Sequence, residues 1–135
     1  MTNKYLAPME SSLEQSACRP QPVGIDSFNS AASIPYGLTI KHLCGAMNEF
    51  IDFIGFMNQQ LHDRSIPRLE TMLMPATFSS IVGEFMASTI PKHCPTIAKN
   101  AYHNGHPDLA PKGMFPGDMV QYTQEGIEVK GSRYP

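Results

Sequence analysis

Charged side chains are scarce in this sequence. Lys, Arg, Asp and Glu make up 16% of its 135 residues, and the formal net charge at pH 7 is -2. A chain so close to neutral has no general electrostatic attraction for the phosphates of nucleic acids. If the protein binds DNA, a local basic patch must do so, unless these residues serve solubility alone. The candidates are Lys92, Lys99, Lys112, Lys130 and Arg133.

Long apolar runs and paired cysteines are also missing. Residues 1–6 lack the apolar segment of a secretory signal peptide, and no run approaches the length needed to cross a membrane. Cys18, Cys44 and Cys94 are an odd number of cysteines at no metal-like spacing. Because disulfides are rare in reducing compartments, we expect reduced thiols in a cytoplasmic protein.

The first quarter of the chain has little that could form a core. Residues 1–33 are rich in Ser, Pro, Asn and Gln, and their apolar positions are not periodic. Burial of so few apolar side chains cannot offset the entropy lost on ordering. We predict a mobile or extended arm, or one that packs on the body through Val23, Ile25 and Phe28. Residues 34–135 are predicted to form one domain, a helical region followed by a small sheet.

The middle of the chain has helical periodicity. Apolar residues recur at steps of three and four between Leu38 and Leu61, which predicts an amphipathic helix packed in the core. Gly45 and Gly55 interrupt it and indicate close packing, since glycine lowers helix propensity.

Prolines divide the next segment into two further helices. Pro67 is expected to open a short helix that Pro75 ends. A third helix is predicted over Ala76–Ser88, with Pro91 just beyond its end. The following segment, 91–117, is rich in proline and glycine and is expected to be mainly loop.

Strand periodicity appears near the C-terminus. Ile127 and Val129 would face one side of a strand, and Glu128 and Lys130 the other. Residues Met119–Tyr122 form a second candidate strand. The polar segment between the two suits a hairpin turn. A carboxylate and an ammonium would then stand side by side on the open face of this hairpin.

A second carboxylate precedes this hairpin. Asp108 follows Pro107, and the Asn104-Gly105 turn would present it. Two converging carboxylates make an oxygen site suited to Mg²⁺, and a neighbouring lysine can activate water or offset charge in phosphodiester hydrolysis. Asp118, at the start of the other candidate strand, is the rival for Asp108. Its alternative role is that of a turn residue.

The pattern Pro107-Asp108 followed by Glu128-Val129-Lys130 resembles the PD-(D/E)XK superfamily of restriction endonuclease-like nucleases. The resemblance covers about the last third of the chain. It implies that Asp108 and Glu128 ligate Mg²⁺, that the Val129 carbonyl assists, and that Lys130 serves the attacking water. It also implies an acidic residue on the preceding helix that extends the metal site. Glu84 is the residue able to take that place, and its alternative is an exposed helical glutamate.

The resemblance predicts an α+β fold, with N-terminal helices packed on a small antiparallel sheet or hairpin as a partial restriction endonuclease-like core. Family members continue beyond the Glu-x-Lys strand, whereas this sequence ends at Pro135. We therefore expect either a truncated member or a protomer completed by a second chain, such as a homodimer. The implied activity is that of a Mg²⁺-dependent endodeoxyribonuclease.

Two other functions stay open from the sequence. A non-catalytic helical interaction protein, or an inactive nuclease remnant, would associate through the Leu43–Leu61 helix. A zinc-binding module is the other, since His and Cys are zinc ligands. Its ligands would be His93, Cys94, His103 and His106, although the usual paired spacing is absent. Of these, His103 and His106 could instead contact a phosphate or assist proton transfer beside the site.

Overall fold

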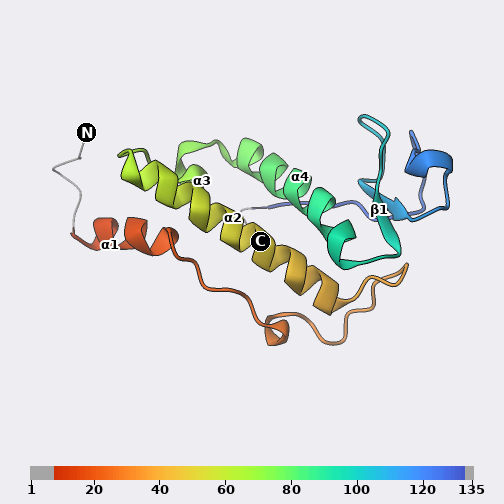
Figure 1. The fold of residues 1–135 in the computed structure, drawn as a ribbon, viewed down its shortest axis with the longest axis horizontal. Helices are drawn as coiled ribbons and strands as arrows, with labels where there is room; N and C mark the ends of the chain where they lie inside the picture. Colours follow the sequence, from red (N-terminus) through yellow and green to blue (C-terminus); the bar gives the residue numbers. More distant parts are fainter. Residues whose placement is uncertain (1–7, 133–135) are drawn as a thin grey trace.

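Helices come first in the chain and a small sheet follows them (Figure 1). The computed structural model describes residues 8–132, and the side chains of residues 12–132. The elements are α1 (Pro8–Ala17), η1 (Ile25–Ser27), α2 (Ile40–Asp63), α3 (Leu69–Met72), α4 (Pro75–His93), β1 (Ile97–Lys99), β2 (Leu109–Pro111) and η2 (Pro116–Asp118).

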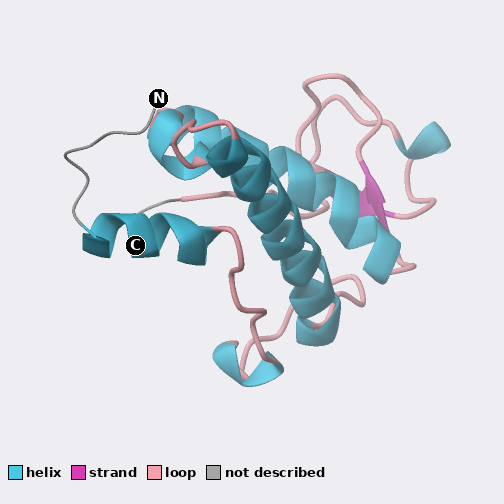
Figure 2. Ribbon diagram, turned by 60° about the vertical axis from the view of Figure 1, so that its left-hand side comes forward, coloured by secondary structure: helices cyan, strands magenta, loops and turns pink. Residues whose placement is uncertain are grey.

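The body of the molecule is the pair of long helices α2 and α4, which lie side by side (Figure 1, Figure 2). Helix α2 begins with a capping box, in which Thr39 and His42 exchange side-chain and main-chain hydrogen bonds. Between the helices, the ring of Phe85 contacts Phe50 at 5.3 Å and Phe53 at 5.0 Å between centroids. The predicted helix over Leu38–Leu61 is confirmed within two residues at each end.

Close approach explains the two glycines in α2. A Cβ added to Gly45 would lie 2.6 Å from the Nδ1 atom of His93 at the end of α4. A Cβ added to Gly55 would lie 2.8 Å from the ring of Pro20. Each distance is shorter than carbon contacts allow, so the close packing predicted at these positions is confirmed.

Helix α3 agrees with the short helix predicted between Pro67 and Pro75. Helix α4 differs from its prediction, because it continues five residues past Ser88 and contains Pro91. A proline in the last turn removes only one main-chain donor. Burial of Ile90, which is 3% exposed, favours continuation of the helix through that turn.

The N-terminal segment also differs from the extended arm predicted for it. Residues Pro8–Ala17 form α1, and Glu14 in this helix pairs with Arg68 at 3.1 Å. Farther along, the Asn48 side chain accepts a hydrogen bond from the Val23 amide and donates one to its carbonyl. The alternative of packing on the body through Val23 therefore describes this part better. Residues 1–7 lie outside the described part of the chain.

Asn58 ties three segments together inside this body. It is 1% exposed, and its amide donates to the Glu70 carboxylate at 3.1 Å and to the Ala17 carbonyl at 3.4 Å. Its oxygen accepts a hydrogen bond from the Leu69 amide at 2.9 Å. These bonds hold α1 and α3 on α2.

We expect Asn58→Leu to lower the free energy of unfolding by about 2–3 kcal/mol, because the buried Leu69 amide and two part-buried acceptors lose their hydrogen bonds together. Urea denaturation measures this change. Gln59→Leu is the matched control, since Gln59 bonds only to the exposed Asp63 one turn away, at 2.8 Å. An equal loss of stability in both variants would refute the role of Asn58.

The sheet is small and packs on α4. Strands β1 and β2 are antiparallel, with Ala98 opposite Ala110. Ile97 and Leu109 are among the fully buried side chains and join the core formed by α2 and α4. The predicted α+β class, with N-terminal helices and a small antiparallel sheet, is confirmed at this level.

The predicted hairpin between Met119–Tyr122 and the Glu128 strand is wrong. Ile127 instead pairs with Leu109 at the free edge of β2, through two hydrogen bonds of 2.9 and 3.0 Å. Tyr122 forms a bridge with His106. The turn signal in the sequence was local, whereas the buried edge at Leu109 offered Ile127 a better partner. As a result Glu128 lies beside Asp108.

Two simpler expectations concern thiols and membranes. Cys18, Cys44 and Cys94 are free cysteines. Within residues 8–132, no helix has both the length and the apolar character required to cross a bilayer.

Candidate functional site

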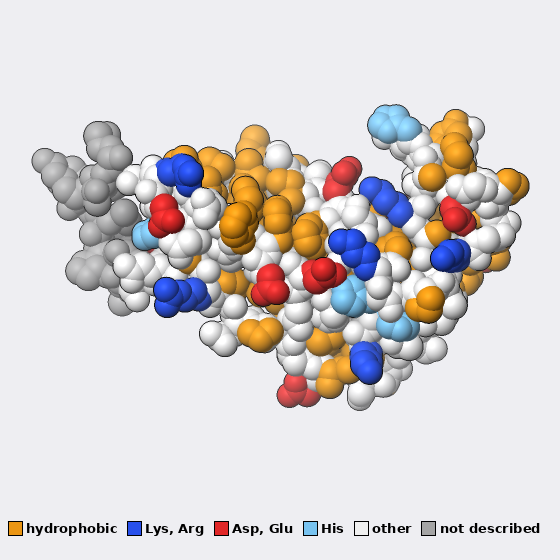
Figure 3. Space-filling model, in the orientation of Figure 1, with side chains coloured by type: hydrophobic (Ala, Val, Ile, Leu, Met, Phe, Trp, Pro, Cys, Tyr) orange, Lys and Arg blue, Asp and Glu red, His pale blue; other side chains and the backbone are white. Residues whose placement is uncertain are grey.

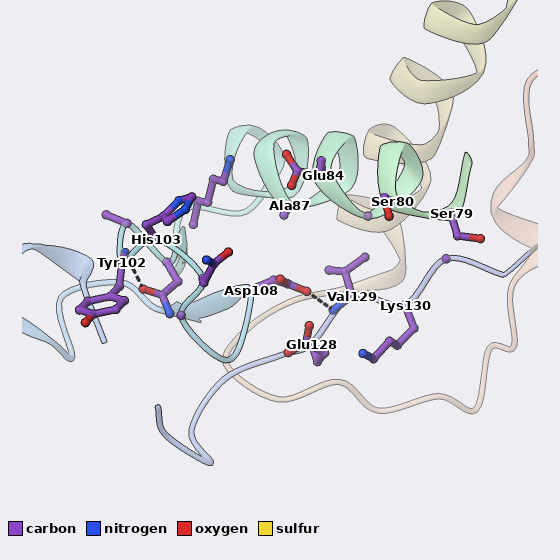
Figure 4. A pocket seen from close by; sticks show the side chains of 17 residues that line it. Ser79, Ser80, Glu84, Ala87, Tyr102, His103, Asp108, Glu128, Val129 and Lys130 are labelled. Atoms are coloured by element: carbon purple, nitrogen blue, oxygen red, sulfur yellow. Dashed lines mark hydrogen bonds between the residues drawn. The ribbon is translucent and has the colours of Figure 1, made fainter. Parts of the chain in front are cut away.

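A cleft of about 840 Å³ opens where α4, the loop between β1 and β2, and the C-terminal segment meet (Figure 4). Helix α4 contributes Ser79, Ser80, Gly83 and Glu84 to its wall. The C-terminal segment runs back along α4, so closely that a Cβ on Gly131 would lie 3.0 Å from the Ser79 carbonyl. The cleft thus brings together segments that are distant in the sequence.

Asp108 enters the cleft at the start of β2. Its Oδ2 atom accepts a hydrogen bond of 2.9 Å from the main-chain amide of Val129. Its own carbonyl accepts one of 2.9 Å from the amide of Asn100. The side chain is half-buried, and the Val129 amide fixes one of its oxygens. The bond from Asn100 fixes the main chain of Asp108.

Glu128 lies next to Asp108, and the two carboxyl groups are within hydrogen-bonding reach of each other (Figure 4). Burial raises the pKa of Glu128, and the hydrogen bond and negative charge of Asp108 raise it further. The charges of His106 and Lys130 act in the opposite direction. The pair therefore resists carrying two negative charges unless a cation or a proton is present.

One oxygen of this pair faces an imidazole. Glu128 Oε2 is buried, and His106 Nδ1 lies 2.5 Å from it, which makes an ion pair when His106 is protonated. When His106 is neutral, a proton or a bound cation would compensate the charge of this buried oxygen.

Lys130 extends from the same segment toward Glu128 (Figure 4). It is exposed, yet close enough that its charge opposes the rise in the pKa of Glu128. The Val129 carbonyl lies on the α4 side of the segment, 3.8 Å from the place of a Cβ on Gly83. Asp108, Glu128, Val129 and Lys130 all line the one cleft.

Glu84 lines the cleft from α4, apart from the carboxyl pair (Figure 4). In the part of the chain that the structure describes, no three His, Cys, Asp or Glu side chains form a group able to hold a metal ion. A hard cation at Asp108 and Glu128 would therefore take its other ligands from main-chain and water oxygens, as Mg²⁺ commonly does.

Asp118 is not part of this site. Its Oδ1 atom accepts a hydrogen bond of 2.9 Å from the Gly113 amide, and its carbonyl accepts one from Ala101. Its φ angle of +55° is typical of a turn. The structure brings Asp108, and not its rival, to Glu128.

The four residues proposed as zinc ligands do not gather. His93 Nε2 lies 2.6 Å from a Glu49 oxygen, and Cys94 is buried with its sulfur 3.2 Å from the Thr96 hydroxyl. His103 lies on the loop wall of the cleft, and His106 contacts the Glu128 carboxylate through Nδ1.

The basic residues are dispersed as well. Lys99 and Lys130 line the cleft, whereas Lys92 is in the last turn of α4 and Lys112 follows β2. Arg133 lies outside the described residues. The face shown in Figure 3 carries isolated Lys and Arg side chains and no continuous basic stripe.

Two residues that position the site have no distinguishing signal in the sequence. Asn100 is 8% exposed and makes four hydrogen bonds, to Tyr102, Pro107 and Val120. Tyr36 donates from its hydroxyl to Glu125 at 2.6 Å and accepts there from the Gly126 amide at 3.1 Å. Both roles depend on main-chain groups that are distant along the chain, which composition and periodicity do not reveal.

No protein-family model, curated protein or solved structure matched this chain in comparison with known proteins.

Proposed function

We propose that the protein is a Mg²⁺-dependent endodeoxyribonuclease, or part of one, that hydrolyses DNA phosphodiester bonds in this cleft. The observation that supports it best is the convergence of Asp108, Glu128 and Lys130. These residues are separated by up to 22 positions in the sequence and meet in one cleft. The same three residues give the sequence its resemblance to the PD-(D/E)XK superfamily, so we further propose that β1, β2 and the Glu128 segment are part of such a core.

Asp108 and Glu128 would hold the Mg²⁺ ion, with the Val129 carbonyl beside them. Their two adjacent carboxylates suit a hard divalent cation, which would reduce the mutual repulsion that raises the pKa of Glu128. When bound, Mg²⁺ polarises a phosphoryl oxygen and lowers the pKa of water. Glu84 adds negative charge on the α4 side of the same cleft, apart from the carboxyl pair. It would extend the metal site on that side.

Lys130 would orient the attacking water through its ammonium, or offset the charge that develops on the phosphate. Its exposed ammonium extends toward Glu128, where the cation and the scissile phosphate would meet (Figure 4). Asp108, in contrast to the exposed Lys130, has one of its oxygens fixed by the Val129 amide.

Lys130→Ala is expected to lower the rate of Mg²⁺-dependent DNA cleavage about a hundredfold or more, the lower range for loss of one group that stabilises charge in the transition state. The measurement is the cleavage of a labelled plasmid and oligonucleotide by the purified protein in Mg²⁺ and in EDTA. Lys112→Ala, which removes an exposed lysine that does not line the cleft, is the control. Wild-type cleavage by Lys130→Ala would refute the role of Lys130.

The raised pKa of Glu128 predicts a pH effect in the absence of Mg²⁺. Because the pKa in the fold exceeds its ordinary value of 4.5, the fold binds this proton more tightly than the unfolded chain. The stabilisation is complete below 4.5 and is lost as pH rises through the raised pKa. Wild-type protein in EDTA should therefore lose more stability than Glu128→Gln as the pH rises from 4.5 through the raised pKa of Glu128, measured by urea denaturation. Parallel pH profiles would contradict the environment described for Glu128.

A second candidate is a non-catalytic interaction protein. Phe56, Met72 and Met74 are 62%, 47% and 74% exposed, and hydrophobic side chains gather over the α2–α4 helices (Figure 3). Exposed apolar patches commonly mark protein interfaces. This candidate predicts no stabilisation by Mg²⁺, whereas the nuclease predicts stabilisation that depends on Glu128.

A further inference from the structure

The loop between β1 and β2 forms one wall of the cleft. Residues 100–105 all line it and include two exposed rings that lie apart: His103 extends toward α4, and the Tyr102 ring points away from the carboxyl pair (Figure 4). Tyr102 is 38% exposed, although it is not part of the core or of the carboxyl pair. Neither ring has a role in the proposed metal chemistry.

This wall is held rigidly. The buried Asn100 side chain bonds to the Tyr102 amide, the Pro107 carbonyl and both main-chain groups of Val120. A Cβ added to Gly105 would lie 2.5 Å from the Val120 carbonyl, so the loop packs tightly against that segment. The rings are thus presented at the cleft by a fixed backbone, which lowers the entropy lost when a ligand binds.

The charges in the cleft are too few to hold a nucleic acid by themselves. Two lysines, Lys99 and Lys130, face the three acids Glu84, Asp108 and Glu128. Two phosphate contacts would change log K by only about 1.4 per tenfold change in salt on a single strand. Phosphate contacts therefore leave most of the binding energy to another kind of contact.

We infer that Tyr102 and His103 form a stacking subsite with two separate positions for unpaired nucleotides of a strand that passes along this loop, so that the preferred substrate is single-stranded DNA. This inference rests on the proposed nuclease function. An aromatic ring contributes about 1–3 kcal/mol per stacked base, and any base offers the required face. The bases of a duplex already stack on one another and are not free to contact these rings.

Fluorescence anisotropy with a labelled single-stranded DNA 12-mer, and with the same sequence as a duplex, tests the subsite. Ca²⁺ replaces Mg²⁺ because it takes the same oxygen ligands. We expect the single strand to bind at least about tenfold more tightly than the duplex. Tyr102→Ala should weaken single-strand binding by about 5- to 150-fold, the equivalent of one lost stack. The double variant with His103→Ala should weaken it further.

Two controls separate stacking from other effects. Tyr102→Phe keeps the ring and should bind within about twofold of wild type. Phe56→Ala removes an exposed ring that does not line the cleft and should change nothing. Equal binding of duplex and single strand, or unchanged binding by Tyr102→Ala, overturns the subsite even if Mg²⁺-dependent cleavage is observed. Single-strand binding that depends on Tyr102 without any cleavage supports the subsite and refutes the nuclease.

Discussion

Glu128→Gln is expected to abolish both the response to Mg²⁺ and DNA cleavage. The substitution keeps the shape of the side chain but removes the charge that a hard cation requires. Wild-type protein should unfold at a higher temperature as Mg²⁺ is added, because a ligand that binds only the folded state stabilises it. Glu128→Gln should show no such shift. Its cleavage rate should fall about a thousandfold or more, since metal polarisation is worth several kcal/mol.

Glu125→Gln is the matched control for this experiment. It makes the same change three residues earlier, at a carboxylate that accepts a hydrogen bond from Tyr36 and does not line the cleft. It should keep both the thermal shift and the cleavage. A Mg²⁺-induced shift that survives in Glu128→Gln would place the metal elsewhere. No shift in the wild type would favour the interaction protein.

Helices α2 and α3 and the place of Asp108 agree with expectations drawn from the sequence. Helix α2 can be predicted because its apolar residues recur at helical steps over more than twenty residues. Asp108 directly follows Pro107, and the structure sets it beside Glu128. Asp118 lies in a turn of positive φ, the alternative role considered for it.

The pairing around the site could not be predicted, because it depends on contacts distant in the sequence. The polar segment 123–126 looked like a local hairpin turn, yet the edge of β2 at Leu109 captures Ile127 instead. In the same way α1 forms a helix whose neighbour Arg68 lies far along the chain. Local periodicity contains no information about such partners.

Gly126 is the point at which this long-range pairing is most sensitive to substitution. Its φ is +136°, and a Cβ would lie 2.3 Å from the Leu109 carbonyl oxygen and 2.5 Å from the Pro107 ring. We expect Gly126→Ala to lower the free energy of unfolding by about 3–4 kcal/mol, the sum of backbone strain and overpacking. Urea denaturation provides the measurement. Because the alanine would push the segment away from β2, Glu128 would also move away from Asp108.

Gly113→Ala separates the two causes of this loss. Gly113 also has a positive φ, of +83°, but a Cβ there would have nothing within 4 Å. It should therefore cost only the strain, about 1–2 kcal/mol, and leave the Mg²⁺ response intact. Gly126→Ala should lose the Mg²⁺ response even under conditions where it stays folded, because Glu128 would move away from Asp108. A displacement of about 1 Å also costs on the order of a hundredfold in activity. If both alanine variants lose equal stability and keep Mg²⁺ binding, then the contact of Gly126 with Leu109 does not hold the carboxyl pair together.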